Sequence, residues 1–146
     1  MRNDAIILVA EDDDGHFTLL EKSLLRSGIH NQIIHFTDGQ ETIEFVNRLK
    51  DPSFVHSKHP CLLLLDIRIP KVDGLQILKF IKCDPEIKKL PVVVFTAAGH
   101  PQVVEECRGL GCNMFVAKPV AYEDFSASME RIGRFLSIIE LPTVIA

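Results

Sequence analysis

The sequence has no marked excess of either charge sign, and it lacks the features of secreted, membrane-spanning and nucleic-acid-binding chains. Its 16 Lys and Arg against 20 Asp and Glu give a formal net charge of −4, whereas a nucleic-acid binder shows a basic patch or stripe. No positively charged stretch leads into a long apolar run near Met1, so we expect no signal peptide. The longest apolar runs, such as 61–65, are too short to span a membrane. We therefore expect a cytoplasmic protein with neither a nucleic-acid nor a membrane partner.

Paired cysteines are missing as well. The sequence shows no CxxC spacing among its four cysteines, which are Cys61, Cys83, Cys107 and Cys112. Because a cytosolic chain of this size gains little from disulfides, we expect reduced thiols. A zinc site that uses Cys107, Cys112 and a histidine is the alternative, although the spacing fits none of the common patterns. A chain of 146 residues has room for one domain, and it buries enough surface to fold without a metal or a disulfide.

Two periodicities alternate along the chain. Short apolar runs predict five parallel strands buried on both faces, at 5–10, 32–36, 61–65, 91–95 and 113–117. Between and after them, apolar residues recur at helical spacing, and the clearest stripe runs from Phe125 to Ile139 before Pro142 ends it. Strict alternation of strands and helices predicts a doubly wound α/β fold. Its ligand crevice would lie at the carboxyl ends of the strands.

Side chains that can bind a cation or a phosphoryl group follow four of the five predicted strands. They are, in chain order, Glu11, Asp12, Asp13 and Asp14 after the first strand, Asp66 after the third, Thr96 after the fourth and Lys118 after the fifth. A Gly-rich loop that would cradle phosphate is missing after the first strand, and carboxylates there would repel an anion. The sequence therefore argues against a dinucleotide site.

The acids at the ends of the first and third strands suit a hard cation. If those strands are neighbours, about 5 Å apart, Glu11, Asp12 and Asp66 converge and need a counter-charge. Mg²⁺ would supply it and would keep coordination sites for phosphate oxygens. Lys118 and Thr96 would add an ammonium group and a hydroxyl. Together these groups form a site for phosphoryl transfer with Asp66 as the nucleophile.

Each of these residues also has a plainer interpretation. Asp13 or Asp14 can cap the helix that begins near Gly15, and we expect one of them to do so. Thr96 can be a strand-end or N-cap residue, and Lys118 can be a surface lysine. The functional interpretation gains weight because all four positions fall at the same end of one predicted sheet.

Four separated motifs resemble those of the receiver domains of two-component response regulators. They are ILVAEDD at 7–13, LLDIRIPKVDG at 64–74, VFTA at 94–97 and VAKP at 116–119. The resemblance extends from about residue 5 to residue 139. It implies a flavodoxin-like fold, with a five-stranded parallel sheet in the order 2-1-3-4-5 and five helices. It also implies a receiver domain over 1–140, a short apolar tail over 141–146 and no output domain.

The resemblance implies a phosphoacceptor and a metal site. Asp66 would accept a phosphoryl group from the phosphohistidine of a sensor histidine kinase. Mg²⁺, for which Mn²⁺ could substitute, would be held by Asp12, Asp66 and the backbone carbonyl of Arg68, with Glu11 acting through water. Such a protein is not an enzyme in the usual sense, although it would phosphorylate itself from small donors and dephosphorylate itself.

The resemblance also implies a switch. Thr96 and Lys118 would contact the phosphoryl group, and Phe115 stands where the family places its aromatic switch residue. The peptide bond between Lys118 and Pro119 would be cis. Movement of Thr96 and Phe115 would change the surface formed by the fourth helix, the fifth strand and the fifth helix.

A narrower resemblance is to the stand-alone receivers that partner bacterial and cyanobacterial phytochrome kinases. It depends on the stretch 84–91, the long loop before Cys61 and the ending 135–142. In and after the last helix, some apolar residues lie off the inward stripe, namely Phe135, Ile138 and Leu141. We expect them to form a homodimer contact or a kinase-docking surface. The alternative is that this edge folds back over the domain.

Two residues depart from the family pattern. Arg68 stands where many relatives carry Asn or Met. Its guanidinium could pair with phosphoryl oxygens or with a neighbouring acid, and either would change the lifetime of the acyl phosphate. Ala98 offers no polar group to orient an attacking water, which favours a longer-lived phosphate.

Two other functions stay open. An aspartyl-nucleophile phosphatase would need a second acid two residues after Asp66, where Arg68 stands. A receiver that only binds partners would need none of the residues for phosphoryl transfer, yet all of them are present. The six histidines show no metal-ligand spacing, so we expect them on the solvated surface, with His16 nearest to the acids.

Overall fold

A computed structural model describes residues 3–97, 100–118 and 122–139, with side chains in the last range described from residue 127 onward. Its parallel strands form one sheet in the order β2-β1-β3-β4-β5, as the resemblance implies. They are β1 (Ile6–Ala10), β2 (Ile33–Phe36), β3 (Cys61–Leu65), β4 (Val92–Thr96) and β5 (Met114–Ala117). The largest difference from the predicted boundaries is at β4, which starts and ends one residue later, so that Thr96 is its last residue.

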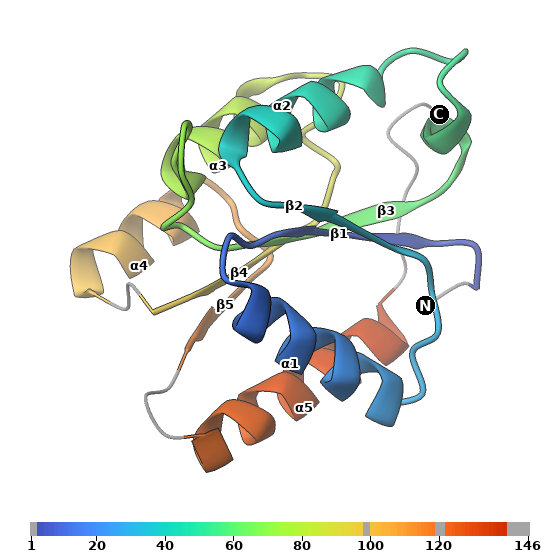
Figure 1. Ribbon diagram of the computed structural model, residues 1–146. Coiled ribbons are helices and arrows are strands. Elements are labelled where there is room, and N and C mark those ends of the chain that lie inside the picture. Colours follow the sequence, from blue (N-terminus) through green and yellow to red (C-terminus); the bar gives the residue numbers. More distant parts are fainter. Residues whose placement is uncertain (1–2, 98–99, 119–121, 140–146) are drawn as a thin grey trace.

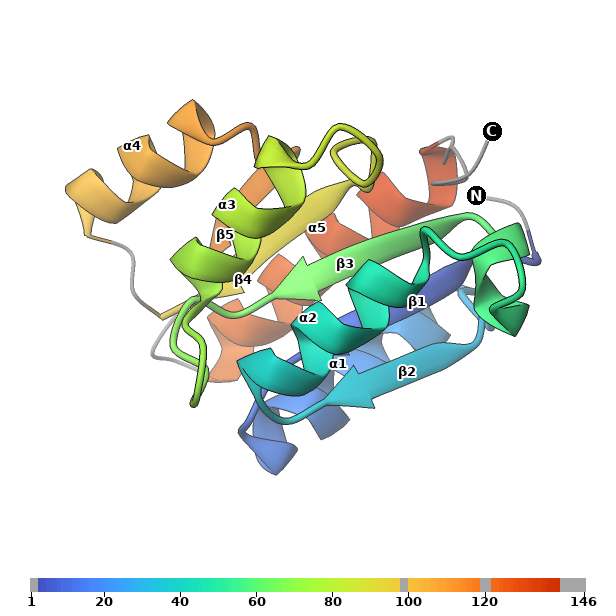
Figure 2. The same cartoon turned by 90° about the horizontal axis from the view of Figure 1, so that it is seen from above.

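Helices cover both faces of the sheet, which confirms the doubly wound arrangement (Figures 1 and 2). They are α1 (Asp14–Arg26), α2 (Gly39–Arg48), α3 (Gly74–Cys83), α4 (Pro101–Gly109) and α5 (Tyr122–Ile138), with a 3₁₀ helix η1 (Val55–Lys58) before β3. Figure 1 shows α1 and α5 side by side below the sheet, and α2, α3 and α4 above it. Among the described residues, no helix is long and apolar enough to cross a membrane.

The apolar strands are continuous because each one serves two cores. Leu63 and Leu65 of β3 pack with residues of α2, α3 and α4, whereas Leu62 and Leu64 pack with residues of α1 and α5. A strand buried on both faces has no polar side in its sequence. This is why the predicted strands were recognisable as unbroken apolar runs.

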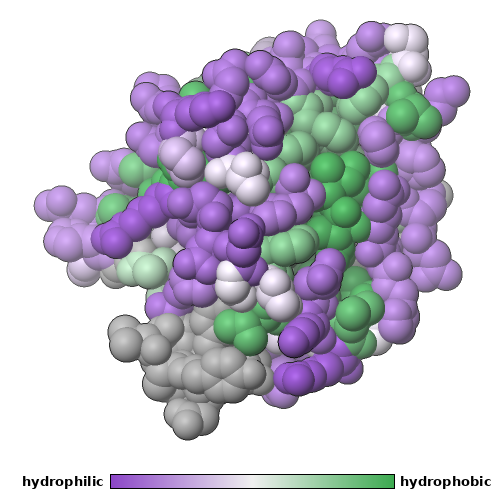
Figure 3. All heavy atoms as spheres, in the orientation of Figure 1, coloured by the Kyte–Doolittle hydropathy of each residue, from purple (hydrophilic) through white to green (hydrophobic). Residues whose placement is uncertain are grey.

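The edge strand β2 is less buried than the central strands. Its residues Ile33 and Ile34 are only half-buried, whereas all five residues of β1 are buried. In the view of Figure 3, hydrophobic atoms are visible beside β2, between the more hydrophilic surfaces of the helices. β2 has only four residues, and a short edge strand limits unwanted pairing with another chain.

Three aspartates cap helices at the carboxyl edge of the sheet. Asp13 accepts a hydrogen bond from the backbone N–H of His16 at 2.9 Å, which confirms the prediction that Asp13 or Asp14 is an N-cap. Asp38 caps α2 and Asp73 caps α3 in the same way. Because side-chain capping fixes where each helix begins, it also fixes the loops that carry the polar strand-end residues.

All four cysteines are free, as predicted. Burial raises the pKa of the Cys61 thiol to about 12, and burial is also the main cause that raises the pKa of the Cys107 thiol to about 11. Neither Cys107 nor Cys112 belongs to a cluster of three potential metal ligands within the described part of the chain. The alternative of a zinc site therefore has no structural support there.

Some predicted features fall outside the described residues. They are the cis bond to Pro119, the role of Ala98, the contact of Leu141 and the apolar tail over 141–146. The division of the chain at residue 140 stays a prediction.

Candidate functional site

Three acidic side chains meet at the carboxyl edge of the sheet. Glu11 and Asp12 directly follow β1, Asp66 directly follows β3, and these two strands are neighbours in the sheet. One carboxylate oxygen from each acid lies within 4.8 Å of the other two. Glu11 and Asp66 are buried and Asp12 is exposed, so the cluster opens to solvent on the side of Asp12.

Lys118, just after β5, lies between the two buried acids. Its Nζ donates to Asp66 Oδ2 at 2.7 Å and also hydrogen-bonds Glu11 Oε1. The side chain of Lys118 is only 4% exposed, so the interpretation as a surface lysine is wrong. A buried ammonium between two carboxylates compensates charge that the interior would otherwise destabilise.

Asp66 accepts hydrogen bonds on both of its oxygens. Thr96 Oγ1 donates to Asp66 Oδ1 at 2.7 Å, and the backbone N–H of Arg68 donates to the same oxygen at 3.0 Å. With Lys118 on Oδ2, three donors orient the carboxylate. The Arg68 side chain itself is exposed and forms no ion pair with any described residue, so its predicted effect on a bound phosphate stays a prediction.

The pKa values of the two buried acids move apart. Burial and the contact with Asp66 raise the pKa of Glu11 to about 8. Burial opposes ionisation of Asp66, but hydrogen bonds from Glu11 and Lys118 outweigh it and hold the pKa of Asp66 below its ordinary value. Two carboxyl groups in contact share one proton in this way. Asp66 is therefore the ionised member of the pair, as a nucleophile must be.

The donor set fits a divalent cation. Glu11 Oε2 is buried and receives no hydrogen bond from a donor in the described residues. A proton shared with Asp66 or a bound cation would satisfy this oxygen, and oxygen ligands are those that Mg²⁺ and Mn²⁺ accept. Three carboxylates converge here, and the pKa of Glu11 is raised. A divalent cation would stabilise the ionised forms of all three.

Two histidines approach the acids, and one of them was not anticipated. His16 Nδ1 lies 3.1 Å from Glu11 Oε1 and 3.1 Å from Lys118 Nζ, as its sequence position near the acids suggested. His35 was expected on the solvated surface, and that expectation is wrong. Its ring stacks on Phe17 with centroids 3.7 Å apart, and its Nε2 lies 2.6 Å from the backbone oxygen of Glu11. The feature that could have predicted this contact is the position of His35 near the end of β2, the strand beside β1, where it is opposite Val9.

The remaining predicted site residues occupy different environments. Phe115 in β5 is half-buried and packs against the core under α4. Phe135 is half-buried and packs against the core under α5, whereas the side chain of Ile138 is 79% exposed. Of the predicted partner surface, Ile138 is thus the member that faces solvent within the described residues.

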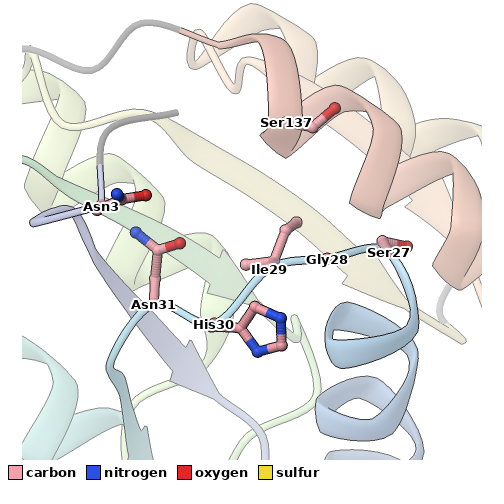
Figure 4. A pocket seen from close by; sticks show the side chains of 7 residues that line it. All are labelled: Asn3, Ser27, Gly28, Ile29, His30, Asn31 and Ser137. Atoms are coloured by element: carbon pink, nitrogen blue, oxygen red, sulfur yellow. The ribbon is translucent and has the colours of Figure 1, made fainter.

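A pocket at the opposite edge of the sheet offers no comparable chemistry. It has a volume of about 240 Å³ and lies between the start of β1, the loop after α1 and the end of α5 (Figure 4). It is lined by Asn3, Ser27, Gly28, Ile29, His30, Asn31 and Ser137. The lining carries amide, hydroxyl and imidazole groups but no carboxylate and no lysine, so it lacks the acids and the ammonium group that meet at the carboxyl edge.

The sheet order and the strand-end cluster of acids, threonine and lysine define a receiver domain. Residues 7–130 match the family described as response regulator receiver domain, and the chain belongs to this family. Proteins of this family are generally not enzymes in the usual sense.

Within the family, the chain is related to phytochrome response regulators. It is 30% identical over 138 residues to the response regulator Rcp1 of Synechocystis sp., covering 94% of this chain and 92% of that protein. The Mn²⁺-bound structure of Rcp1 matches with a TM-score of 0.83, 28% identity and coverage of 94% and 98%. The phosphorylated cyanobacterial phytochrome response regulator RcpA matches with a TM-score of 0.82, 27% identity and coverage of 94% and 97%. A receiver domain from Rhodospirillum rubrum matches with a TM-score of 0.86, 33% identity and coverage of 97% and 99%.

Proposed function

We propose that this receiver accepts a phosphoryl group on Asp66 from a sensor histidine kinase, in a Mg²⁺-dependent reaction, and signals by changing its binding surface. The observation that carries the proposal is the setting of Asp66: it is buried in the cluster with Glu11 and Asp12, and three donors orient its carboxylate. These features describe an activated carboxylate nucleophile.

The transfer follows from the positions of the side chains. An oxygen of Asp66 attacks phosphorus, an acyl phosphate forms, and the bond from phosphorus to the histidine nitrogen of the donor breaks, leaving its electron pair on that nitrogen. Lys118 and Thr96 already donate to the two oxygens of Asp66, so each lies close enough to bond the phosphoryl oxygens that arrive there. Lys118 would neutralise negative charge on the phosphoryl oxygens. Thr96, the last residue of β4, would transmit the presence of the phosphoryl group to that strand.

Glu11, Asp12, Asp66 and the backbone carbonyl of Arg68 would hold the metal ion. Mg²⁺, or Mn²⁺ in its place, would supply positive charge at the phosphoryl oxygens while they move onto Asp66. The convergence of the three acids and the unsatisfied Glu11 Oε2 support this assignment. The Mn²⁺-bound state of the related Rcp1 is in line with it.

The proposed partner is a sensor histidine kinase of the phytochrome class, in the cytoplasm. Its support is the similarity to Rcp1 and RcpA, whose relation to phytochromes is a property of those proteins. Phe115 would take part in the switch from its half-buried position in β5. The exposed Ile138 on α5, with Phe135 beside it and Leu141 beyond, would contribute to a homodimer or kinase contact.

A phosphorylation assay tests this function. The protein is incubated with Mg²⁺ and acetyl phosphate, and its mass is measured. We expect a gain of one phosphoryl group in the wild type and none in Asp66→Asn. Asp73→Asn is the matched control, because Asp73 caps α3 from the same loop and asparagine caps equally well.

The other candidate functions give different results in the same assay. An undiminished mass gain in Asp66→Asn would contradict the assignment of the acceptor. A wild type that gains no mass would favour a receiver that only binds partners. Continuous release of phosphate from a phosphomonoester would favour a phosphatase.

A further inference from the structure

The loop that follows the acceptor is joined to the start of α2. This loop, residues 67–73, connects β3 to α3. The backbone N–H of Gly39 donates to the carbonyl oxygen of Pro70 at 2.9 Å. Lys71 Nζ lies 3.3 Å from Asp38 Oδ2. A Cβ at Gly39 would lie 1.9 Å from the carbonyl oxygen of Val72, so only glycine allows this approach.

The loop has an unusual backbone at the point of contact. Lys71 has a φ of 70°, which an L-residue with a long side chain rarely adopts. The N–H of Val72 donates to the carbonyl oxygen of Pro70 at 2.9 Å, which closes a tight three-residue turn around Lys71. Such a conformation persists where the surroundings hold it in place. Here the surroundings are Gly39 and Asp38.

The same loop reaches the acceptor at its other end. The N–H of Arg68 donates to Asp66 Oδ1 at 3.0 Å, and the N–H of Gly74 donates to the carbonyl oxygen of Ile67 at 2.8 Å. Only Ile69 separates Arg68 from Pro70. A shift of the turn around Lys71 therefore moves the backbone of Arg68, which contacts the acceptor and carries the proposed metal-binding carbonyl.

We propose that Asp38, Gly39 and Lys71 are positioning residues that set the metal affinity of the acceptor site through the loop 67–73. This inference builds on the proposed function, because it assumes that the acids and Arg68 bind Mg²⁺. Coupling between two sites is reciprocal. Binding of Mg²⁺ must therefore also stabilise the first turn of α2, residues 39–42.

The test separates the ion pair from the capping of α2. Asp38 Oδ1 accepts from the N–H of Glu41 at 2.8 Å while Oδ2 faces Lys71. Asp38→Ser keeps an N-cap and removes the ion pair, and Lys71→Asn removes the charge but tolerates a positive φ. The double variant keeps the net charge of the chain, so long-range effects on a cation cancel. We expect its Mg²⁺ affinity, measured by calorimetry, to fall about threefold, because the exposed Lys71 limits the strength of its ion pair with the buried Asp38.

A glycine substitution tests the close approach. Gly39→Ala places a methyl group against the backbone of Val72, so we expect at least a tenfold loss of Mg²⁺ affinity. Gly109→Ala is the matched control, because a Cβ at Gly109 of α4 meets nothing within 4 Å. If Gly39→Ala does not fold, the double variant still decides the question.

A second measurement excludes a purely structural role. Hydrogen exchange of the amides of 39–42 is followed with and without Mg²⁺, and we expect Mg²⁺ to slow exchange in the wild type and less so in the double variant. If the wild type binds Mg²⁺ while the double variant and Gly39→Ala bind it equally well, the inference is overturned. If the wild type binds no Mg²⁺ at all, the proposed function fails instead.

Discussion

Two lysines anchor polar clusters at opposite ends of the sheet, and their partners give them different roles. Lys118, at the carboxyl edge, bonds the carboxylates of Glu11 and Asp66. Lys82, at the amino edge, donates to the carbonyl oxygen of Leu90 at 2.8 Å and to Asn113 Oδ1 at 3.3 Å. Burial lowers the pKa of Lys82, and no carboxylate pairs with it among the described residues.

The clusters differ in whether another ligand can replace the lysine as the partner of the surrounding oxygen atoms. Backbone carbonyls offer Lys82 neutral acceptors that hold the turn before β4 in one shape. The carboxylates around Lys118 carry charge that a cation or a proton can also compensate, so its hydrogen bonds can be given up when another ligand arrives. The buried Lys118 is therefore a functional candidate because its partners are acids at strand ends, whereas the half-buried Lys82 is a structural one because its partners are carbonyls.

The largest expected difference concerns phosphoryl transfer. Lys118→Met removes the ammonium that would bind the phosphoryl oxygens, and we expect the rate of phosphorylation at saturating Mg²⁺ to fall about a hundredfold or more. Lys82→Met should leave that rate within about twofold of the wild type, because Lys82 lies at the other edge of the sheet. Both rates are measured by mass spectrometry with acetyl phosphate. Equal effects of the two substitutions would remove the distinction between the clusters.

The second difference concerns pH in the absence of metal. The pKa of Glu11 is raised to about 8 from 4.5, so its protonated form stabilises the folded state. This contribution is complete below about pH 4.5 and is lost as the pH rises through about 8. In EDTA, we expect the stability of the wild type relative to Glu11→Gln to fall between about pH 5 and about pH 8, as measured by urea unfolding.

The Lys82 cluster and added metal are the controls for this pH effect. Between about pH 5 and about pH 8 the stability of the wild type relative to Lys82→Met should change little, because the lysine partners there are carbonyl and amide oxygens. Added Mg²⁺ should reduce the pH dependence that Glu11 causes, since a cation replaces the proton. A wild type and a Glu11→Gln variant with parallel pH profiles in EDTA would contradict the assignment of the proton to Glu11.

The third difference concerns stability. Lys82→Met keeps the apolar stem but removes the donor from the carbonyl oxygens of Lys88 and Leu90 and from Asn113. We expect a loss of about 1–2 kcal/mol in the free energy of unfolding, measured in urea. Lys89→Met, at an exposed position in the same turn, should change it by less than about 0.5 kcal/mol. Equal losses in the two variants would show that Lys82 has no structural role.

The smallest difference concerns the exposed cation beside the acceptor. Arg68→Ala leaves the N–H bond to Asp66 in place and removes only the guanidinium. We expect the rate of autodephosphorylation to change by a few-fold, which is followed as loss of phosphoprotein mass with time. A rate equal to that of the wild type would show that the side chain does not reach the phosphate.

The sequence predicted the features that local rules determine. Unbroken apolar runs mark strands buried on both faces, and residues directly after such strands lie at one edge of a parallel sheet. Position at the strand ends therefore predicts that Glu11, Asp66, Thr96 and Lys118 lie close together. The capping by Asp13 followed from the preference for short polar side chains at helix starts.

The features that sequence reasoning missed depend on contacts between distant segments. His35 stacks on Phe17 because β2 lies next to β1, and a histidine at a strand end does not reveal this by itself. The contact of Gly39 with the carbonyl of Val72 joins the start of α2 to a loop far along the chain. The loop 51–60 contains the helix η1, which has no apolar stripe of its own.

The hydrogen bond from Thr96 to Asp66 has a consequence for how a phosphoryl group would bind. Its hydroxyl already lies 2.7 Å from an oxygen of the acceptor without phosphate. In the proposed reaction, Thr96 therefore needs little movement to reach an incoming phosphoryl oxygen. Asp66 already holds this hydroxyl in place, so a phosphoryl group that binds it would not have to order the Thr96 side chain. Part of the entropy cost of binding is thus met by the fold itself.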